Sequence, residues 1–251
     1  MKIATVHDVQ FKMDDDLYEW YTRPRQMEVG SQSVWYFHTG MFFEMKSFQY
    51  TCERDQYPVF FDIGAHCGIF SFSYCSLVSQ HKCYSIEPVR DHINRINAVA
   101  NTNGFNISAH HLGFSDRSDV VIYEDPHMAR WVNTETGEGH VDGYEMDTVK
   151  LITMDEFVKG NEAPSLVKID TEGFEVPILR GAQHTLINHH PTLFIETHIE
   201  ESRVLGHDIK EICDLIPSIY TFYTCDGILI KDLESFMFHD NNLRFVAMVT
   251  D

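Results

Sequence analysis

The chain has 251 residues, of which 43% are hydrophobic, enough to bury a core in one large α/β domain or two small ones. Its formal net charge is −19, and protonating all 15 histidines would still leave it negative. Because affinity for phosphate backbones comes mostly from Lys and Arg, this charge argues against a nucleic-acid partner.

Cysteine usage and the N-terminal sequence indicate the compartment. The six cysteines form neither a CxxC pair nor the Cys/His spacing of a zinc site, which favours free thiols in a reducing environment. The apolar run before His7 is four residues long, too short for the core of a signal peptide, so we expect a cytoplasmic protein. The longest stretch without Asp, Glu, Lys or Arg, residues 63–80, contains glycine, histidine and several serines, and we expect no membrane span.

From Tyr57 onward, short β-rich runs alternate with helical patterns, as is typical of a parallel sheet with crossover helices. Apolar stripes predict one helix around residues 93–100, stopped by Asn103-Gly104, and another over residues 178–186, with Pro177 in its first turn. The predicted strands are 58–63, 83–86, 106–112, 166–170 and 192–196, followed by a closing antiparallel pair over 218–230 and 243–250.

Two segments fall outside this alternation. Residues 1–56 are rich in aromatic side chains, which form either additional core or an aromatic wall for a ligand. Residues 124–146 are acidic and contain three glycines, so we expect an exposed excursion there. The predicted organisation is an N-terminal aromatic-rich cap over residues 1–56 and an α/β domain over residues 57–251.

The clearest motif is VFFDIGAHCGIFS at residues 59–71, an apolar strand followed by a glycine-containing loop and an apolar helix. Gly64 and Gly68 let the backbone turn tightly and approach a ligand, and the helix start presents N–H groups. Glu87 ends the next strand, where a carboxylate can bind both hydroxyls of a ribose. This order of elements predicts a nucleoside cofactor.

The loop also indicates which nucleoside binds. Ala65 and His66 stand where a dinucleotide motif needs its middle glycine, and Asp62 precedes the loop. An acid at this place would repel a pyrophosphate but suits the positively charged sulfonium and ammonium groups of S-adenosylmethionine. A nicotinamide or flavin cofactor and a plain strand-to-helix turn remain the alternatives.

A second motif, SLVKIDTEGFEVPILRGA at residues 165–182, places Lys168 and Asp170 on one face of a predicted strand. If the strand over residues 192–196 lies beside it, Glu196 and His198 reach the same edge of the sheet, where open α/β sheets bind ligands. The alternative is a purely structural network in which Lys168 neutralises the carboxylates.

The joint order DIGAHCGIFS, SIEP, MDEF, LVKIDTEGFEVPILRGA and PTLFIETH resembles the FkbM family of S-adenosylmethionine-dependent methyltransferases over about residues 57–198. The resemblance implies a Rossmann-like class I methyltransferase fold: a seven-stranded, mostly parallel sheet with a C-terminal antiparallel pair and helices on both faces. It also implies O-methylation of a sugar, a glycan or a sugar-bearing small molecule, with S-adenosylhomocysteine as product. Residues 1–56 match the family poorly, which leaves the acceptor and the oligomeric state unpredicted.

By position, the resemblance places the donor along the first loop, the ends of the next two strands and the second motif. The residues are Asp62, Gly64, Ala65, His66, Gly68, Glu87, Pro88, Gly113, Phe114 and Asp170.

For the chemistry, we expect Asp170 to act as the base, held by Lys168 and flanked by Glu196, with His198 as the second candidate. Crowded carboxylates are expected to raise one another's pKa and so prepare one of them for proton transfer. A rival mechanism adds Mg²⁺ or Mn²⁺ bound by Asp170 and Glu196. Two other classes stay open, a catalytically silent nucleoside-binding module and a nicotinamide oxidoreductase.

Overall fold

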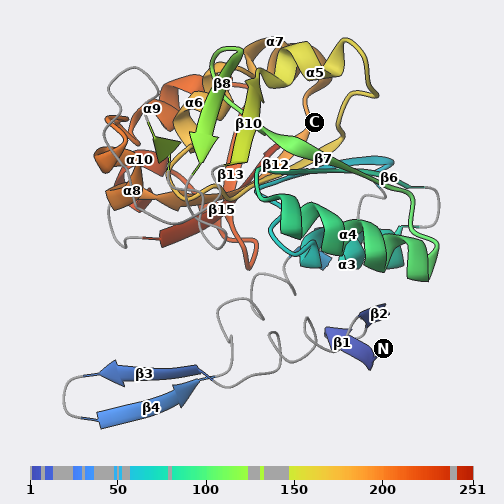
Figure 1. The fold of residues 1–251 in the computed structure, drawn as a ribbon. Helices are drawn as coiled ribbons and strands as arrows, with labels where there is room; N and C mark the ends of the chain where they lie inside the picture. The colour runs from blue at the N-terminus through green and yellow to red at the C-terminus, as the bar shows by residue number, and fades with distance from the viewer. Residues whose placement is uncertain are drawn as a thin grey trace.

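A computed structural model describes residues 2–6, 9–13, 25–29, 32–36, 48–49, 51–52, 57–78, 81–123, 131–132, 147–237 and 242–250. Its centre is a mixed sheet of eleven strands in the order β14-β13-β15-β12-β11-β5-β6-β7-β10-β8-β9 (Figure 1). In chain order these strands are β5 (Val59–Ile63), β6 (Lys82–Glu87), β7 (Ile107–Phe114), β8 (Asp119–Tyr123), β9 (Trp131–Val132), β10 (Asp147–Ile152), β11 (Leu166–Ile169), β12 (Thr192–His198), β13 (Tyr220–Thr224), β14 (Leu229–Ile230) and β15 (Asn242–Val249).

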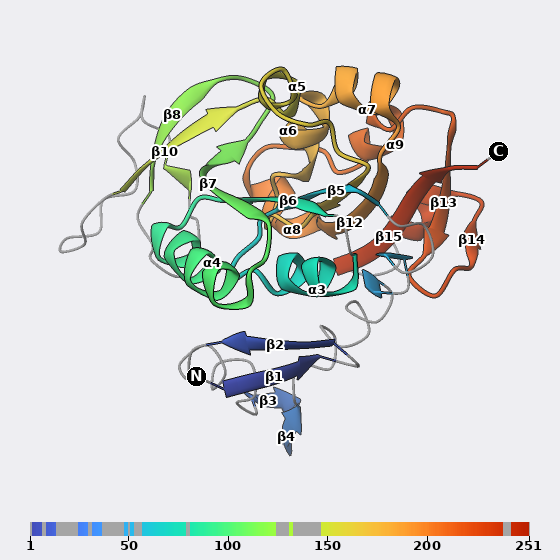
Figure 2. The same ribbon diagram turned by 90° about the vertical axis from the view of Figure 1, so that its right-hand side faces the viewer.

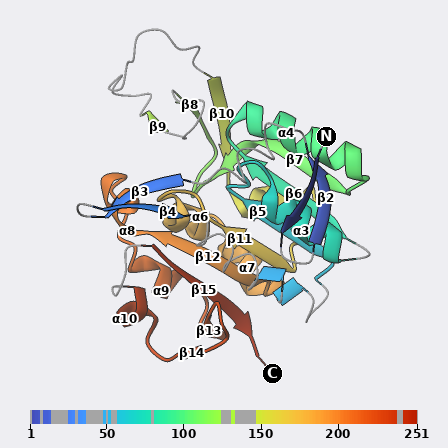
Figure 3. The ribbon, with the colours of Figure 1, turned by 90° about the horizontal axis from the view of Figure 1, so that it is seen from below.

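The expected mostly parallel sheet with a C-terminal antiparallel pair is confirmed. Strands β7, β6, β5, β11 and β12 pair in parallel, and β15 inserts antiparallel between β12 and β13 (Figure 3). Strands β10, β8 and β9 extend one edge and β14 the other, so the sheet is wider than the seven strands expected. Because parallel strands end at the same edge, the carboxyl ends of β5, β6, β11 and β12 lie next to one another.

Helices cover both faces of the sheet. On one face lie α3 (Ile69–Leu77) and α4 (Arg90–Asn103), and α4 ends at Gly104, whose φ of 70° lets its N–H reach the carbonyl of Ala100. The apolar residues of the remaining helices join a separate core on the other face (Figure 2). These helices are α5 (Met154–Val158), α6 (Glu175–Arg180), α7 (Gln183–His189), α8 (Ile199–Val204), α9 (Glu211–Leu215) and α10 (Leu233–Met237).

The single helix predicted over residues 178–186 is wrong, because the chain forms α6 and α7 instead. Gly181 ends α6 in close contact with the backbone of Ser115, where an added Cβ would lie 2.0 Å from the carbonyl oxygen. Asp155 then starts α7, since its carboxylate accepts the backbone N–H groups of His184 and Thr185 at 2.9 and 2.7 Å. An apolar stripe alone cannot show a break that is imposed by a distant acid.

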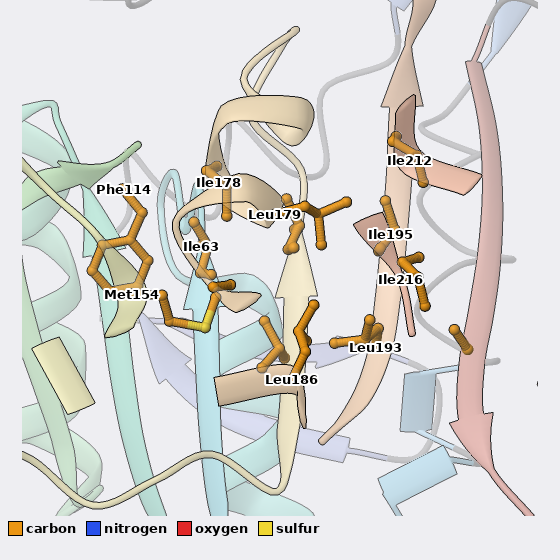
Figure 4. Packing of buried hydrophobic residues seen from close by; sticks show 14 of the residues in the cluster. Ile63, Phe114, Met154, Ile178, Leu179, Leu186, Leu193, Ile195, Ile212 and Ile216 are labelled. Carbon is orange, nitrogen blue, oxygen red and sulfur yellow. The ribbon is translucent and has the colours of Figure 1, made fainter. Parts of the chain in front are cut away.

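An apolar core lies on each face of the sheet. The central strand β5 lies between the two cores and is therefore buried along its whole length. Phe61 and Ile63 face the core under α5–α7, whereas Phe60 faces the core under α3 and α4. Figure 4 shows the first of these cores, in which Ile63, Phe114, Met154 and Leu186 pack together. The other labelled members of this core are Ile178, Leu179, Leu193, Ile195, Ile212 and Ile216.

Within residues 1–56 the structure describes two hairpins, β1 (Lys2–Val6) with β2 (Val9–Met13) and β3 (Arg25–Val29) with β4 (Gln32–Tyr36), together with four residues at 48–52. Strand β2 lies against α3 and α4, and the backbone of Lys12 exchanges two hydrogen bonds of 2.8 Å with the side chain of Asn103. Phe48 is fully buried against Phe60 and Phe70. Most of the predicted excursion at 124–146 lies outside the described residues.

Among the described residues, no helix has both the length and the hydropathy that a membrane crossing requires.

The contact at Gly181 predicts a measurable cost for Gly181→Ala. The methyl group meets the fixed carbonyl of Ser115, so we expect the free energy of unfolding in urea to fall by roughly 1–3 kcal/mol. Gly160→Ala is the matched control, because nothing lies within 4 Å of the added Cβ there. Equal stability of the two variants would contradict the packing described.

Candidate functional site

The glycine-containing loop of residues 64–68 follows β5 and is held against its neighbours by backbone contacts. Gly64 and Ala65 both donate their N–H groups to the carbonyl of Ile86, at 3.0 and 3.1 Å. Gly64, His66 and Gly68 all have positive φ, and a Cβ at Gly64 would lie 1.9 Å from the carbonyl oxygen of Asp170. The loop after β5 and the segment after β11 are therefore packed directly on each other.

Asp62 precedes this loop in β5, and its side chain is fully buried. One carboxylate oxygen accepts the backbone N–H and the hydroxyl of Ser71, at 3.1 and 2.6 Å, which fixes the first turn of α3. The other oxygen lies 3.5 Å from Nζ of Lys168. Burial raises the pKa of Asp62, and Lys168 partly offsets that effect. The structure thus places the carboxylate of Asp62 between α3 and Lys168, and its expected contact with the donor stays a prediction.

Lys168 connects the two loops. Its Nζ donates to the carbonyl oxygen of Gly64 at 2.8 Å and lies 3.2 Å from Oδ2 of Asp170, with the ring of Phe70 5.0 Å away. Burial alone would lower the pKa of Lys168, but Asp170 and Asp62 raise it above its ordinary value. The lysine is therefore charged and joins the ends of β5 and β11.

Glu87 ends β6, as expected, but protein donors already use most of its carboxylate. Oε2 accepts the backbone N–H of His66 at 2.7 Å, and Oε1 accepts that of Val89 at 2.9 Å and lies 3.2 Å from Nδ1 of His92. A carboxylate has about four lone-pair positions, so roughly one remains. Binding both hydroxyls of a ribose would require one of these protein donors to move.

The remaining residues predicted for the donor lie around this strand end. Ala65 is buried, Pro88 is half-buried, and Gly113 is buried near the end of β7. The ring of Phe114 lies in the apolar core, 5.3 Å from the ring of Phe157. Phe114 could therefore meet a ligand only through its backbone.

His198 lies at the centre of four carboxylates. Its Nδ1 is 3.1 Å from Glu175, and its Nε2 is 3.5 Å from Glu196, 3.6 Å from Glu172 and 3.9 Å from Asp170. Burial lowers the pKa of His198, but the hydrogen bonds to Glu175 and Glu196 outweigh it and raise the value to about 11. At neutral pH this histidine carries a proton, so it is a cation rather than a base.

The expectation that crowding raises the pKa of the acids holds for Glu172 and not for Asp170. Burial raises the pKa of Asp170, but Lys168 and His198 outweigh it and the value is lowered. Burial, with Asp170 and Glu196 in support, raises the pKa of Glu172. These two acids are also the accessible ones, with 27% and 65% of their side chains exposed.

Two further residues complete this site: Arg244, which the sequence did not single out, and Glu175, an acid of the second motif. Arg244 forms a two-pronged pair with Glu196, at 2.9 and 2.6 Å, because the two residues are cross-strand neighbours in β12 and β15. Glu175 accepts the backbone N–H groups of Thr171 and Gly173, each at 3.2 Å, and so shapes the turn. Only the pairing of β12 with β15 could have identified Arg244, whereas Glu175 was expected among the acids around Lys168.

The expected alternative with a metal at Asp170 and Glu196 fits this arrangement poorly. Together with His198, these residues bring one ligand atom each to within 4.8 Å of one another. However, Arg244 engages both oxygens of Glu196, and a protonated imidazole has no lone pair to donate. Lys168, His198 and Arg244 already supply the positive charge that an ion would bring.

The raised pKa of His198 predicts how stability depends on pH. The contribution of its proton to stability is complete below pH 6.5, the ordinary pKa, and is lost as the pH rises toward 11. We expect the stability difference between the wild type and His198→Gln to shrink from pH 7 to pH 10, by at most about 1.4 kcal/mol per pH unit. Urea denaturation at several pH values measures it. The control is His189→Gln, at the exposed end of α7. A stability difference between the wild type and His198→Gln that stays constant with pH would contradict the raised pKa of His198.

Comparisons with known proteins agree with this fold. The hexuronic acid methyltransferase AglP of Haloferax volcanii is 26% identical over 137 residues, which cover 53% of this chain and 54% of that protein, so the chain spans about half the length of this curated relative. The crystal structure of methyltransferase FkbM from Methylobacillus flagellatus aligns with a TM-score of 0.51 at 18% identity, over 77% of this chain and 44% of that chain. A model of the methyltransferase FkbM domain matches residues 62–222, more than half of the chain. The chain therefore belongs to the FkbM methyltransferase family.

Proposed function

We propose that this chain transfers a methyl group from S-adenosylmethionine to a hydroxyl oxygen of a sugar or glycan and releases S-adenosylhomocysteine. The observation that carries the proposal is the direct packing of the glycine loop on the acidic segment. Gly64 touches the carbonyl of Asp170, and Lys168 bonds to the carbonyl of Gly64. A donor on the loop and a hydroxyl beside Asp170 would thus be held next to each other, which is the main requirement of an in-line displacement.

The residues of the loop and the adjoining strand end fit a nucleoside donor. Three of the five loop residues have positive φ, so the backbone can approach a ligand closely. Glu87 retains acceptor capacity for a ribose hydroxyl. When bound, S-adenosylmethionine supplies an electrophilic methyl group on a positively charged sulfur.

Asp170 is the proposed base, with Glu172 as the alternative. Asp170 is ionised and held by Lys168 beside the loop, so it could accept the hydroxyl proton as the new O–C bond forms and the C–S bond breaks. Glu172 is more exposed and has the raised pKa, which favours proton transfer near neutral pH. His198, which carries its own proton, would hold both carboxylates in place.

Two observations bear on the class of acceptor. The relative AglP is named a hexuronic acid methyltransferase, which makes glycans containing hexuronic acids the first acceptors to test. The net charge of −19 and the exposed acids at the site favour a neutral sugar instead. Transfer of labelled methyl groups to matched neutral and uronic-acid oligosaccharides would separate the two classes.

Donor binding predicts a thermal shift. A ligand at 100 times its Kd adds about 2.7 kcal/mol of stability, which is a rise in Tm of roughly 5–10 °C for a chain of this length. We expect this rise with S-adenosylhomocysteine and none with NAD at the same concentration. A shift with NAD alone would replace the methyltransferase proposal by the oxidoreductase alternative. Donor binding without transfer to any acceptor would instead favour a silent binding module.

Substitutions at the two exposed acids identify the base. Asp170→Asn should keep the binding of S-adenosylhomocysteine and lower kcat by about 10²–10⁴-fold, because loss of a positioned base costs that much. Glu172→Gln should then lower kcat only slightly. Single-turnover methyl transfer, with donor affinity measured in parallel, is the readout. If Glu172→Gln gives the large loss and Asp170→Asn the small one, the proton acceptor is Glu172.

A further inference from the structure

Two histidines and one cysteine meet beside the glycine loop. His66 and Cys67 are consecutive loop residues, and His92 comes from the first turn of α4. One ring nitrogen of each histidine and Sγ of Cys67 lie within 4.8 Å of one another. The two imidazole rings are 4.2 Å apart, centroid to centroid, at an angle of 59°. Cys67 and His92 are buried and His66 is half-buried, so the group is shielded but has one accessible member.

A thiolate with two imidazoles is a donor set that zinc prefers, whereas magnesium and manganese prefer oxygen. Around a tetrahedral zinc ion, neighbouring ligand atoms lie about 3.3–3.7 Å apart. The three atoms would need to approach one another by at most about 1.5 Å. A three-residue site leaves the fourth position to water.

Glu87 provides an independent reason to consider an ion here. Metal-binding histidines usually give their second ring nitrogen to a carboxylate, which fixes the ring and strengthens the bond to the metal. Oε1 of Glu87 lies 3.2 Å from Nδ1 of His92, so Nε2 would be the ligand. Oε2 of the same carboxylate accepts the backbone N–H of His66 and positions the start of the His66-Cys67 pair.

We propose that His66, Cys67 and His92 bind a zinc ion, with Glu87 orienting His92. Binding transfers the thiol proton of Cys67 to the solvent and forms one Zn–S and two Zn–N bonds. Because 24 residues lie between Cys67 and His92, no zinc-binding spacing is visible in the sequence, and only the neighbouring positions of the loop and α4 bring the ligands together.

The site also predicts competition with the methyl donor, and this part rests on the proposed function. His66 and Glu87 belong to the loop and the strand end assigned to the donor. An ion that fixes both residues would occupy donor-facing groups, so zinc and S-adenosylhomocysteine should each weaken the binding of the other by the same factor.

The binding test adds Zn²⁺ or Co²⁺ to the full chain. We expect one Zn²⁺ per chain by calorimetry, with a heat that depends on the buffer because a proton is released. Co²⁺ should give a thiolate-to-cobalt absorption band in the near ultraviolet. Cys67→Ser should remove this band, and Glu87→Gln should weaken metal binding about 10–100-fold.

Two variants serve as matched controls for the ligands. Cys213→Ser and His189→Gln change a half-buried cysteine and an exposed histidine outside the group, and they should bind zinc like the wild type. His92→Gln provides a second ligand variant if Cys67→Ser does not fold, which circular dichroism shows. Equal zinc affinity of the wild type, Cys67→Ser and His92→Gln, or no zinc binding by the wild type, would overturn the proposal.

Calorimetry with S-adenosylhomocysteine in the presence and absence of Zn²⁺ tests the competition. A donor affinity that zinc leaves unchanged would contradict competition while the metal site stands. If S-adenosylhomocysteine fails to bind even to the zinc-free chain, the proposed function fails, and the cobalt band still decides the metal site.

Discussion

The whole site depends on one buried cation, Lys168. Burying the charged amino group of a lysine away from water is unfavourable unless anions and hydrogen-bond acceptors surround it. Here Asp62, Asp170 and the carbonyl of Gly64 meet that requirement, and each belongs to a different part of the site. The lysine thereby fixes the distance between the loop after β5 and the segment after β11. If its charge were removed, the buried carboxylate of Asp62 would keep Ser71 but lose its positive neighbour, so the stability of the site and its proposed function depend on the same interaction.

A second cation organises the acids further along the edge. His198 keeps its proton because Glu175 and Glu196 bond to it, and Arg244 engages the outer side of Glu196. Four carboxylates can share this small space because Lys168, His198 and Arg244 stand among them. The four acids therefore differ in their exposure. Glu175 and Glu196 are buried within the network, whereas Asp170 and Glu172 remain accessible to a ligand.

Most of the sheet could be predicted from the sequence, because parallel strands buried on both faces produce short continuous apolar runs such as Val59–Ile63. Glycines at required positive φ also leave a clear signal, as at Gly64 and Gly68. What the sequence could not show are contacts between distant segments. The break between α6 and α7 depends on Asp155, and the pairing of Glu196 with Arg244 depends on the register of β12 and β15. The lowered pKa of Asp170 has another origin: Lys168 lies in the same motif, but the sequence does not show that this lysine and His198 outweigh the neighbouring acids.

Phe48 limits how far the chain can be shortened at its N-terminal side. Its ring sits among Phe60, Phe70 and Phe194, at centroid distances of 5.1, 5.0 and 5.8 Å. A truncated form that starts at β5 would uncover the parts of these three rings that Phe48 covers, and exposed apolar surface promotes aggregation. A fragment that keeps this apolar cluster intact therefore begins upstream of residue 48, well before the first strand of the central sheet.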